Sequence, residues 1–304
     1  MLVAEELDPK GLSLLQAGGH PYRYLPGLWQ EGGRLQEELK EAHALIVRNR
    51  IRVDRELLEG APRLRVVGRL GTGLDNVDLK ALEEKGVALV HAPGANAVAV
   101  AEYVLAALFH LARNLPRAAR GGERLALGGF ELGGKILGLV GLGEVGLRVA
   151  FRAKALGMEV VGYDPWRRPW EAPLEAAGVR LVSLEEVLAQ AEFLSLHAPL
   201  TPETRGMIGE GALARMRPGA YLINTARGGL VDHLALARAL EGGALAGAVL
   251  DVTEPEPLPE DHPLKRLPTC LITPHVAGLT REAQARVGEW VVRGVLEVLR
   301  AHAA

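Results

Sequence analysis

Several features are missing from this sequence, and each absence excludes a class of protein. The single cysteine, Cys270, cannot form an intramolecular disulfide or a cysteine-rich zinc site. No apolar run approaches the roughly 18–20 residues that are needed to span a bilayer. The formal net charge is only −2, which excludes nucleic acid or a membrane surface as the main partner. The N-terminal residues show no basic segment followed by an apolar stretch, so we expect no signal peptide and a cytoplasmic location.

Lysine is also scarce. Seven of the 35 basic residues are lysines, which leaves 28 arginines. This bias is typical of some thermophilic proteins, and a GC-rich genome produces it as well. We predict a heat-stable protein, and a melting temperature in the ordinary mesophile range would contradict that prediction.

The residues that are present predict a folded α/β protein. Hydrophobic residues make up 48% and charged residues 24% of the 304 positions, which excludes an intrinsically disordered chain. The length favours two domains. Short apolar runs alternate with helical stretches, so we expect two doubly wound parallel sheets. The expected strands are residues 44–47, 64–67, 87–90, 136–140, 159–163, 193–196, 221–223, 246–250 and 271–272.

Three helical segments have recognisable boundaries. Residues 98–115 form a long, alanine-rich, mostly apolar stretch, which we expect to be buried on most sides and to end at Pro116. Ser183 and Glu186 have the spacing of a capping box. Residues 280–300 predict a long C-terminal helix that packs back on the first domain.

A glycine-rich turn follows the expected strand 136–140. Gly141, Gly143 and Gly146 form a G-x-G-x-x-G pattern between a strand and a helix, which is the context of a dinucleotide-binding loop. Asp164 lies 18 residues further on, at the end of another expected strand, where a carboxylate binds the adenosine ribose and favours NAD over NADP. Arg167 and Arg168 could weaken that preference. The structural alternative is a glycine-rich turn with a surface aspartate.

Three further segments follow expected strands of the second series, at the edge where α/β sheets bind ligands. They supply an arginine, a carboxylate and a histidine, in residues 224–229, 251–257 and 273–278. Hydride transfer needs a partner proton transfer, which histidine performs near neutral pH. A carboxylate would orient the imidazole, and an arginine would bind a substrate carboxylate through two hydrogen bonds. Each residue alone is also compatible with a turn or a solvated loop, and no spacing indicates a metal.

The sequence resembles the D-2-hydroxyacid dehydrogenase family, and within it most closely the D-3-phosphoglycerate dehydrogenases. The motifs that carry the resemblance occur in the same order from about residue 44 to about residue 286. They are VGRLGTGLDNVD at 67–78, ANAVAVAEYVLAALFHLARNLPRA at 95–118, LGLVGLGEVG at 137–146, LHAPLTPETRGMI at 196–208, NTARGGLVD at 224–232, AVLDVTEPEPL at 248–258 and ITPHVAG at 272–278.

The resemblance implies a division of labour between two domains. Residues 1–93 and 281–304 would form a flavodoxin-like substrate domain, and residues 94–280 a Rossmann NAD-binding domain. His275 would be the general acid and base, Glu256 its partner, and Arg227 the anchor for the substrate. The implied NAD-binding residues are Thr72, Gly141, Gly143, Glu144, Val145, Gly146, Asp164, Ala198, Thr225, Ala226, Arg227, Asp251, His275 and Gly278. The implied substrate-binding residues are Arg48, Arg69, Leu70, Gly71 and Arg227, with Arg50 as a third candidate cation for a phosphate.

The implied reaction is the NAD-dependent oxidation of 3-phospho-D-glycerate to 3-phosphohydroxypyruvate, the first step of serine biosynthesis. A glyoxylate or hydroxypyruvate reductase, or another D-2-hydroxyacid dehydrogenase, is the nearest alternative. A formate-type dehydrogenase is a minor one, and an NAD(H)-sensing corepressor-like scaffold is a remote one. The expected substrate is a small 2-hydroxy or 2-oxo acid, and no metal is expected. The chain is expected to form a homodimer or homotetramer through an interface around residues 98–115.

The sequence departs from the family pattern at a few positions. Thr253 replaces a usual aromatic residue, His233 a usual acid, and Arg124 is only a rough match to a basic residue that contacts substrate. The chain stops soon after the expected C-terminal helix, so we expect no feedback by serine through a regulatory extension.

Overall fold

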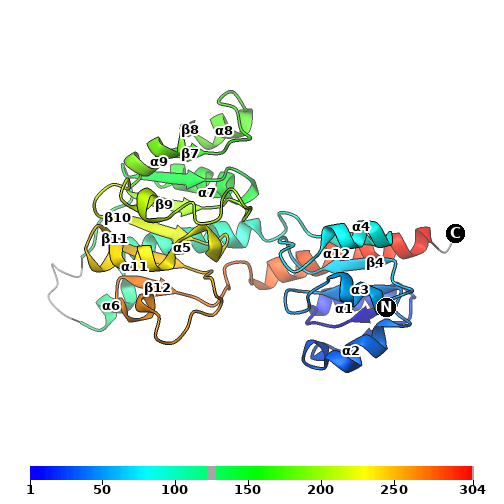
Figure 1. The fold of residues 1–304 in the computed structure, drawn as a ribbon. Coiled ribbons are helices and arrows are strands. Elements are labelled where there is room, and N and C mark those ends of the chain that lie inside the picture. The colour runs from blue at the N-terminus through cyan, green and yellow to red at the C-terminus, as the bar shows by residue number, and fades with distance from the viewer. Residues whose placement is uncertain (122–127, 303–304) are drawn as a thin grey trace. The chain divides into compact units, whose positions relative to one another are not determined.

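The structure of the chain, a computed structural model, describes residues 1–121 and 128–302 (Figure 1). The chain folds into two compact units. One unit combines Met1–Asn96 with Leu279–Ala304, and the other is Ala97–Gly278. Each unit contains one sheet in which every pair of neighbouring strands is parallel. The predicted α/β fold class is therefore confirmed.

The first unit is built on a five-stranded sheet in the order β2-β1-β3-β4-β5, the strand order of flavodoxin-like sheets. Side chains of β3 alternate between the two faces. Leu45 and Val47 join the core on one face, and Ala44 and Ile46 join the core on the other. The strands are β1 (Leu2–Val3), β2 (Arg23–Tyr24), β3 (Ala44–Val47), β4 (Val66–Arg69) and β5 (Ala88–His91).

Helices cover both faces of this sheet. The cores contain residues of α2, α3 and α4 on one face, and of α1 and α12 on the other. Helix α12 lies against β4 so closely that a Cβ atom on Gly68 would be 2.8 Å from Val291 and Val295. The C-terminal segment is therefore part of the first unit. The helices are α1 (Pro9–Ala17), η1 (Leu28–Gln30), α2 (Gly32–Leu39), α3 (Arg55–Glu59), α4 (Leu79–Lys85) and α12 (Arg281–Ala301).

The second unit has a seven-stranded sheet in the order β12-β11-β10-β9-β6-β7-β8. Its first six strands follow the order of a Rossmann sheet, with one more strand added at the edge. From β6 the chain adds strands first on one side of the sheet and then, from β9, on the other. Ligands bind beyond the carboxyl ends of the strands at such a switch point. The strands are β6 (Ile136–Val140), β7 (Glu159–Tyr163), β8 (Val179–Leu181), β9 (Phe193–Leu196), β10 (Ala220–Asn224), β11 (Leu245–Leu250) and β12 (Cys270–Ile272).

Two hydrophobic cores sandwich this sheet. One core contains residues of α5, α7 and α8, and the other contains residues of α9, α10 and α11. The helices are α5 (Ala97–Arg113), α6 (Leu115–Ala119), α7 (Glu144–Ala155), α8 (Ala172–Ala177), α9 (Leu184–Gln190), α10 (Glu210–Leu213), η2 (Gly228–Leu230), α11 (His233–Glu241) and η3 (Pro263–Arg266). Among the residues that the structure describes, no helix is both long and apolar enough to cross a membrane.

The structure corrects three details of the predicted elements. The strand expected at 64–67 is β4, which begins two residues later, at Val66. Helix α5 ends at Arg113 rather than at Pro116, because Asn114 adopts a left-handed backbone (φ 38°) and its side chain accepts a hydrogen bond from the Arg117 amide. Pro116 lies in the first turn of α6, where proline is well tolerated. The strands β1, β2 and β8 were not predicted, since two or three residues are too few to show a periodic pattern. The predicted capping box of Ser183 and Glu186 is confirmed.

Candidate active site

The predicted cofactor and catalytic residues of the second unit lie on loops that follow parallel strands, except Glu144, Val145 and Gly146, which form the first turn of α7. The glycine loop follows β6, and the loops of Arg227, Asp251 and His275 follow β10, β11 and β12. Because parallel strands end at the same edge of a sheet, the topology gathers these loops at the carboxyl edge.

Two glycines of the loop are required by close backbone packing, and the third faces open space. A Cβ atom on Gly141, whose φ is +94°, would lie 2.7 Å from the His197 carbonyl, and one on Gly146 would lie 2.2 Å from the Gly141 oxygen. A Cβ atom on Gly143 would meet nothing within 4 Å. Gly143 is also the N-cap of α7 and provides no side-chain acceptor for the first turn. Amides at such a helix N-terminus bind phosphate oxygens.

Asp164 lies beside this loop, directly after β7. Its Oδ2 accepts a hydrogen bond from the Leu142 amide at 2.8 Å, and its Oδ1 accepts one from the Trp166 amide at 2.9 Å. The Arg167 guanidinium is engaged by Glu171 at 2.7 Å and by the Leu142 carbonyl at 3.2 Å. The carboxylate of Asp164 therefore faces the glycine loop, while the neighbouring Arg167 is paired with Glu171.

The Arg227 loop is locked against the loop that carries Glu256. The buried Asn224 side chain donates to the Arg227 carbonyl at 2.9 Å and accepts from the Ala226 amide at 3.0 Å. A Cβ atom on Gly228 would lie 2.1 Å from the Thr253 carbonyl carbon, so only glycine allows this contact. Backbone packing thus sets the position of Arg227 relative to the loop of Glu256.

His275 and Glu256 are in direct contact. The Nδ1 atom of His275 lies 2.9 Å from Oε1 of Glu256, and both side chains are about half exposed. The hydrogen bond that His275 donates to Glu256 raises the pKa of His275 above its ordinary value, although burial and the charge of Arg227 act in the opposite sense. Burial acts to raise the pKa of Glu256, but the hydrogen bond with His275 and the positive charges of His275 and Arg227 outweigh it and lower that pKa. The three predicted catalytic residues therefore share one electrostatic environment.

The buried Asp251 side chain accepts hydrogen bonds from the backbone of the His275 loop. It is 1% exposed, and its carboxylate accepts hydrogen bonds from the Thr273 hydroxyl at 2.6 Å and from the Val276 and Ala277 amides at 2.8 Å. The sequence did not reveal the roles of Thr273 or of Tyr103, whose hydroxyl contacts Thr273. Both residues lie within motifs that carry the family resemblance, at 95–118 and 272–278, but the resemblance implied no role for either of them.

The remaining predicted cofactor residues of this unit lie at the same edge. Ala198 follows β9, Thr225 and Ala226 follow β10, and Gly278 ends the His275 loop. The Thr225 hydroxyl oxygen is buried and has no hydrogen-bond partner within the described chain. An orphaned hydroxyl, an open glycine cradle and an uncapped helix N-terminus fit a dinucleotide.

In the first unit, two predicted cations lie at the carboxyl ends of neighbouring strands. Arg48 directly follows β3, and Arg69 ends β4. Arg48 is partly buried, its Nε has no hydrogen-bond partner among the described residues, and burial lowers the pKa of its guanidinium. The strand order changes direction between β1 and β3, so Arg48 lies at the point where ligands bind in such sheets.

The loop after β4 is shaped around Arg69. The Arg69 Nη1 donates to the Leu70 carbonyl at 3.3 Å, and a Cβ atom on Gly71 would lie 1.6 Å from that nitrogen. The Thr72 hydroxyl donates within the unit, to the Ala92 carbonyl and to Asn96. Arg50, the third candidate, has its guanidinium 4.2 Å from the centre of the Trp29 ring.

Two of the residues that depart from the family pattern, Thr253 and His233, are buried in the second unit. Thr253 is buried, and its hydroxyl donates to the Pro255 carbonyl at 2.9 Å. His233 is buried at the first turn of α11. Arg124 lies outside the described residues.

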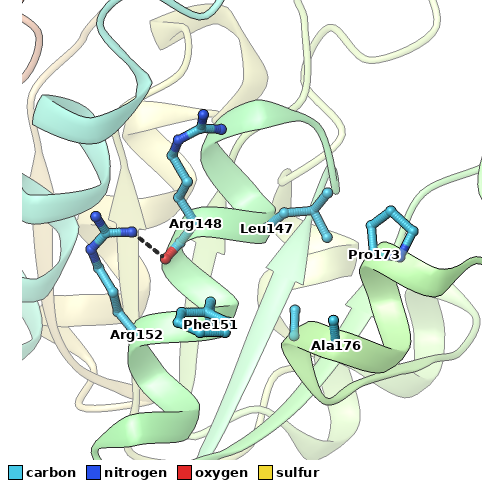
Figure 2. A pocket seen from close by; sticks show the side chains of 7 residues that line it. Leu147, Arg148, Phe151, Arg152, Pro173 and Ala176 are labelled. Atoms are coloured by element: carbon cyan, nitrogen blue, oxygen red, sulfur yellow. Dashed lines mark hydrogen bonds between the residues drawn. The ribbon is translucent and has the colours of Figure 1, made fainter.

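A hollow elsewhere on the second unit is a separate feature. It has a volume of about 210 Å³ and lies between α7 and α8 (Figure 2). None of the predicted site residues lines it. Its lining residues are Leu147, Arg148, Phe151, Arg152, Pro173, Ala176 and Ala177.

Comparisons with known proteins identified similar sequences and structures. The family model described as "D-isomer specific 2-hydroxyacid dehydrogenase, NAD binding domain" matches residues 103–277. D-3-phosphoglycerate dehydrogenase of Methanocaldococcus jannaschii is 42% identical over 100% of this chain and 58% of that protein. (S)-sulfolactate dehydrogenase of Chromohalobacter salexigens is 46% identical over 87% of this chain and 86% of that protein.

The solved structures that resemble this chain include D-lactate dehydrogenase from Aquifex aeolicus, complexed with NAD and lactic acid. It is 30% identical, with a TM-score of 0.85, and the match covers 99% of this chain and 96% of that chain. The present chain spans little more than half the length of the phosphoglycerate dehydrogenases that it matches.

Proposed function

Since this chain belongs to the D-isomer specific 2-hydroxyacid dehydrogenase family, we propose that it oxidises 3-phospho-D-glycerate to 3-phosphohydroxypyruvate with NAD. In the cell this reaction would be the first step of serine biosynthesis. The observation that supports the chemistry is the contact between His275 and Glu256 within the field of Arg227. The units would divide the work, with residues 94–280 binding NAD and residues 1–93 and 281–304 binding the substrate.

The acid–base step follows from the hydrogen bond of His275. A carboxylate can only accept, so Nδ1 carries the hydrogen and Nε2 is left as the base. During oxidation, Nε2 takes the proton of the C2 hydroxyl while the C2–H bond breaks, and a carbonyl group forms at C2. Glu256 stabilises the resulting imidazolium, and Arg227 binds the substrate carboxylate. Bound NAD supplies the hydride acceptor. In the reverse reaction the imidazolium returns the proton.

The choice of a phosphorylated substrate depends on the first unit. Arg48 lies at the carboxyl edge of the sheet, and its Nε has no hydrogen-bond partner in the part of the chain that the structure describes; Arg69 ends the next strand. Such guanidinium groups suit a phosphate, which binds arginine through paired hydrogen bonds. The sulfonate of sulfolactate is likewise a second anion on C3, so the similarity to a sulfolactate dehydrogenase supports a second-anion site and leaves the anion itself to be tested.

A substrate panel with NADH tests the proposal. We expect faster reduction of phosphohydroxypyruvate, measured as kcat/KM, than of sulfopyruvate, hydroxypyruvate or glyoxylate. A preference for sulfopyruvate would change the proposed substrate but leave the proposed acid–base mechanism unchanged. Equal rates on hydroxypyruvate or glyoxylate would identify a reductase without a phosphate site. Tight NADH binding without turnover of any 2-oxo acid would contradict the enzymatic role and favour a sensing scaffold.

A further inference from the structure

A chain of hydrogen bonds connects helix α5 to the loop that carries His275. The Tyr103 hydroxyl contacts the Thr273 hydroxyl, which in turn donates to Oδ1 of Asp251 at 2.6 Å. The same carboxylate accepts the amides of Val276 and Ala277, which directly follow His275. Tyr103 and the His275 loop, which these hydrogen bonds connect, are far apart in the sequence but belong to the same unit.

The direction of these hydrogen bonds follows from the groups involved. Thr273 has one hydroxyl hydrogen, and the carboxylate of Asp251 can only accept it. Tyr103 must therefore donate to Thr273. Burial raises the pKa of Tyr103, so its hydroxyl keeps the hydrogen that this contact requires. Linked hydrogen bonds of this kind polarise and strengthen one another.

The His275 loop needs external support because its backbone is strained. His275 has a φ of +57°, a left-handed conformation that residues other than glycine rarely adopt and that persists only when the surroundings enforce it. Its amide donates to the carbonyls of Asp251 at 2.9 Å and of Thr273 at 3.0 Å. The two residues that hold the strained backbone are thus the two that Tyr103 supports.

We propose that Tyr103 is a positioning residue for His275: its hydroxyl anchors, through Thr273 and Asp251, the loop that presents the imidazole to the substrate alcohol. This inference rests on the proposed function of His275. Helix α5, which carries Tyr103, packs against β10 and β11, so the anchor is fixed to the core of the unit rather than to another loop.

The protonation of His275 reports on this anchor. The charged groups that act on the imidazole are Glu256, Asp251 and Arg227, and the Glu256 hydrogen bond is the largest influence. If the loop loosens, that hydrogen bond lengthens on average and the pKa of His275 falls toward its ordinary value. A residue that only stabilised the fold would leave this pKa unchanged.

The test compares Tyr103→Phe with the unaltered chain. We expect the pKa of His275, measured by NMR titration of the cofactor-free protein, to fall. We expect kcat for the preferred 2-oxo acid to fall about fivefold, as for the loss of one hydrogen bond, while KM and the Kd of NADH stay unchanged. Thr273→Val should lower both the pKa of His275 and kcat in the same way. Thr273→Ser keeps the hydroxyl, so both values should stay those of the unaltered chain. The double variant Tyr103→Phe/Thr273→Val should be no worse than Thr273→Val alone.

Tyr221→Phe is the matched control, since Tyr221 is a partly buried tyrosine of the same unit that takes no part in this network. It should leave the titration and kcat unchanged. An unchanged His275 titration in Tyr103→Phe, or additive effects in the double variant, would overturn the inference. If the unaltered chain reduces no 2-oxo acid, the proposed function fails, while the NMR titration still decides the role of Tyr103.

Discussion

Glu256 and His275 lie on loops that follow neighbouring strands, and Oε1 of the glutamate is 2.9 Å from Nδ1 of the imidazole. The contact determines which ring nitrogen is free, because the carboxylate can only accept and Nδ1 must carry the hydrogen. It would also keep a negative charge beside the proposed base, His275, which would become positive during oxidation. The chemistry of the site therefore depends on a distance that spans two loops.

His275→Ala should remove the base while NADH still binds. We expect kcat to fall by at least about 100-fold, the usual contribution of a positioned acid–base group. Fluorescence titration should show that NADH still binds to the variant. Near-normal turnover would refute the assignment of His275.

Glu256→Gln should change the pH dependence in a defined direction. Glu256 raises the pKa of His275, so removal of its charge lowers that pKa. Reduction needs protonated His275 and is active below this pKa, so its alkaline limit should move to lower pH. Oxidation needs the neutral ring, so its acid limit should move to lower pH as well. Profiles of kcat against pH in both directions check this, and unshifted limits would show that the pair does not control the reaction.

Arg48→Ala should weaken recognition of the second anion. We expect kcat/KM for phosphohydroxypyruvate to fall by about tenfold or more, as for a lost charged hydrogen bond, with little change for hydroxypyruvate. Arg52→Ala is the control, because the side chain of Arg52 is 82% exposed and belongs to the same segment. Equal losses for both substrates, or for both variants, would place the phosphate site elsewhere.

Asp164→Asn should relax the choice of cofactor. Its carboxylate faces the glycine loop through the Leu142 amide, where it would bind a ribose and repel a 2′-phosphate. We expect the Kd of NADH to rise by about tenfold and the preference over NADPH to shrink. Glu175→Gln, an exposed position on the adjacent α8, should change neither value. An unchanged preference would assign the discrimination to other residues.

Leu115→Glu should weaken self-association if the chain forms the expected dimer. Phe109 and Leu115, near the end of α5 and the start of α6, are 47% and 69% exposed, and apolar surface of this kind favours an interface. We expect sedimentation velocity to show a dimer for the unaltered chain and more monomer for the variant. Leu79→Glu, on an exposed leucine of α4, is the control. A monomeric unaltered chain would contradict the expectation.

Much of the fold follows from local patterns. The strands at 44–47, 136–140, 159–163 and 193–196 coincide with β3, β6, β7 and β9, because runs of buried apolar residues between turns are a local property of the chain. The roles of Gly141 and Gly146 were also predictable, since each lies against backbone atoms of the same loop or of a neighbouring loop. The short strands and the end of α5 at Asn114 were not readable, because they depend on two or three residues.

The sequence by itself determined two parallel α/β sheets, a dinucleotide loop, and the loops that carry an arginine, a glutamate and a histidine, since short-range sterics and hydrophobic periodicity specify these features. Only the tertiary structure decided which groups meet. It placed Glu256 on His275, stacked Arg50 on Trp29, and linked Tyr103 to Thr273 across 170 positions. Such contacts form when helices and strands pack into layers, and spacing along the chain does not encode that packing.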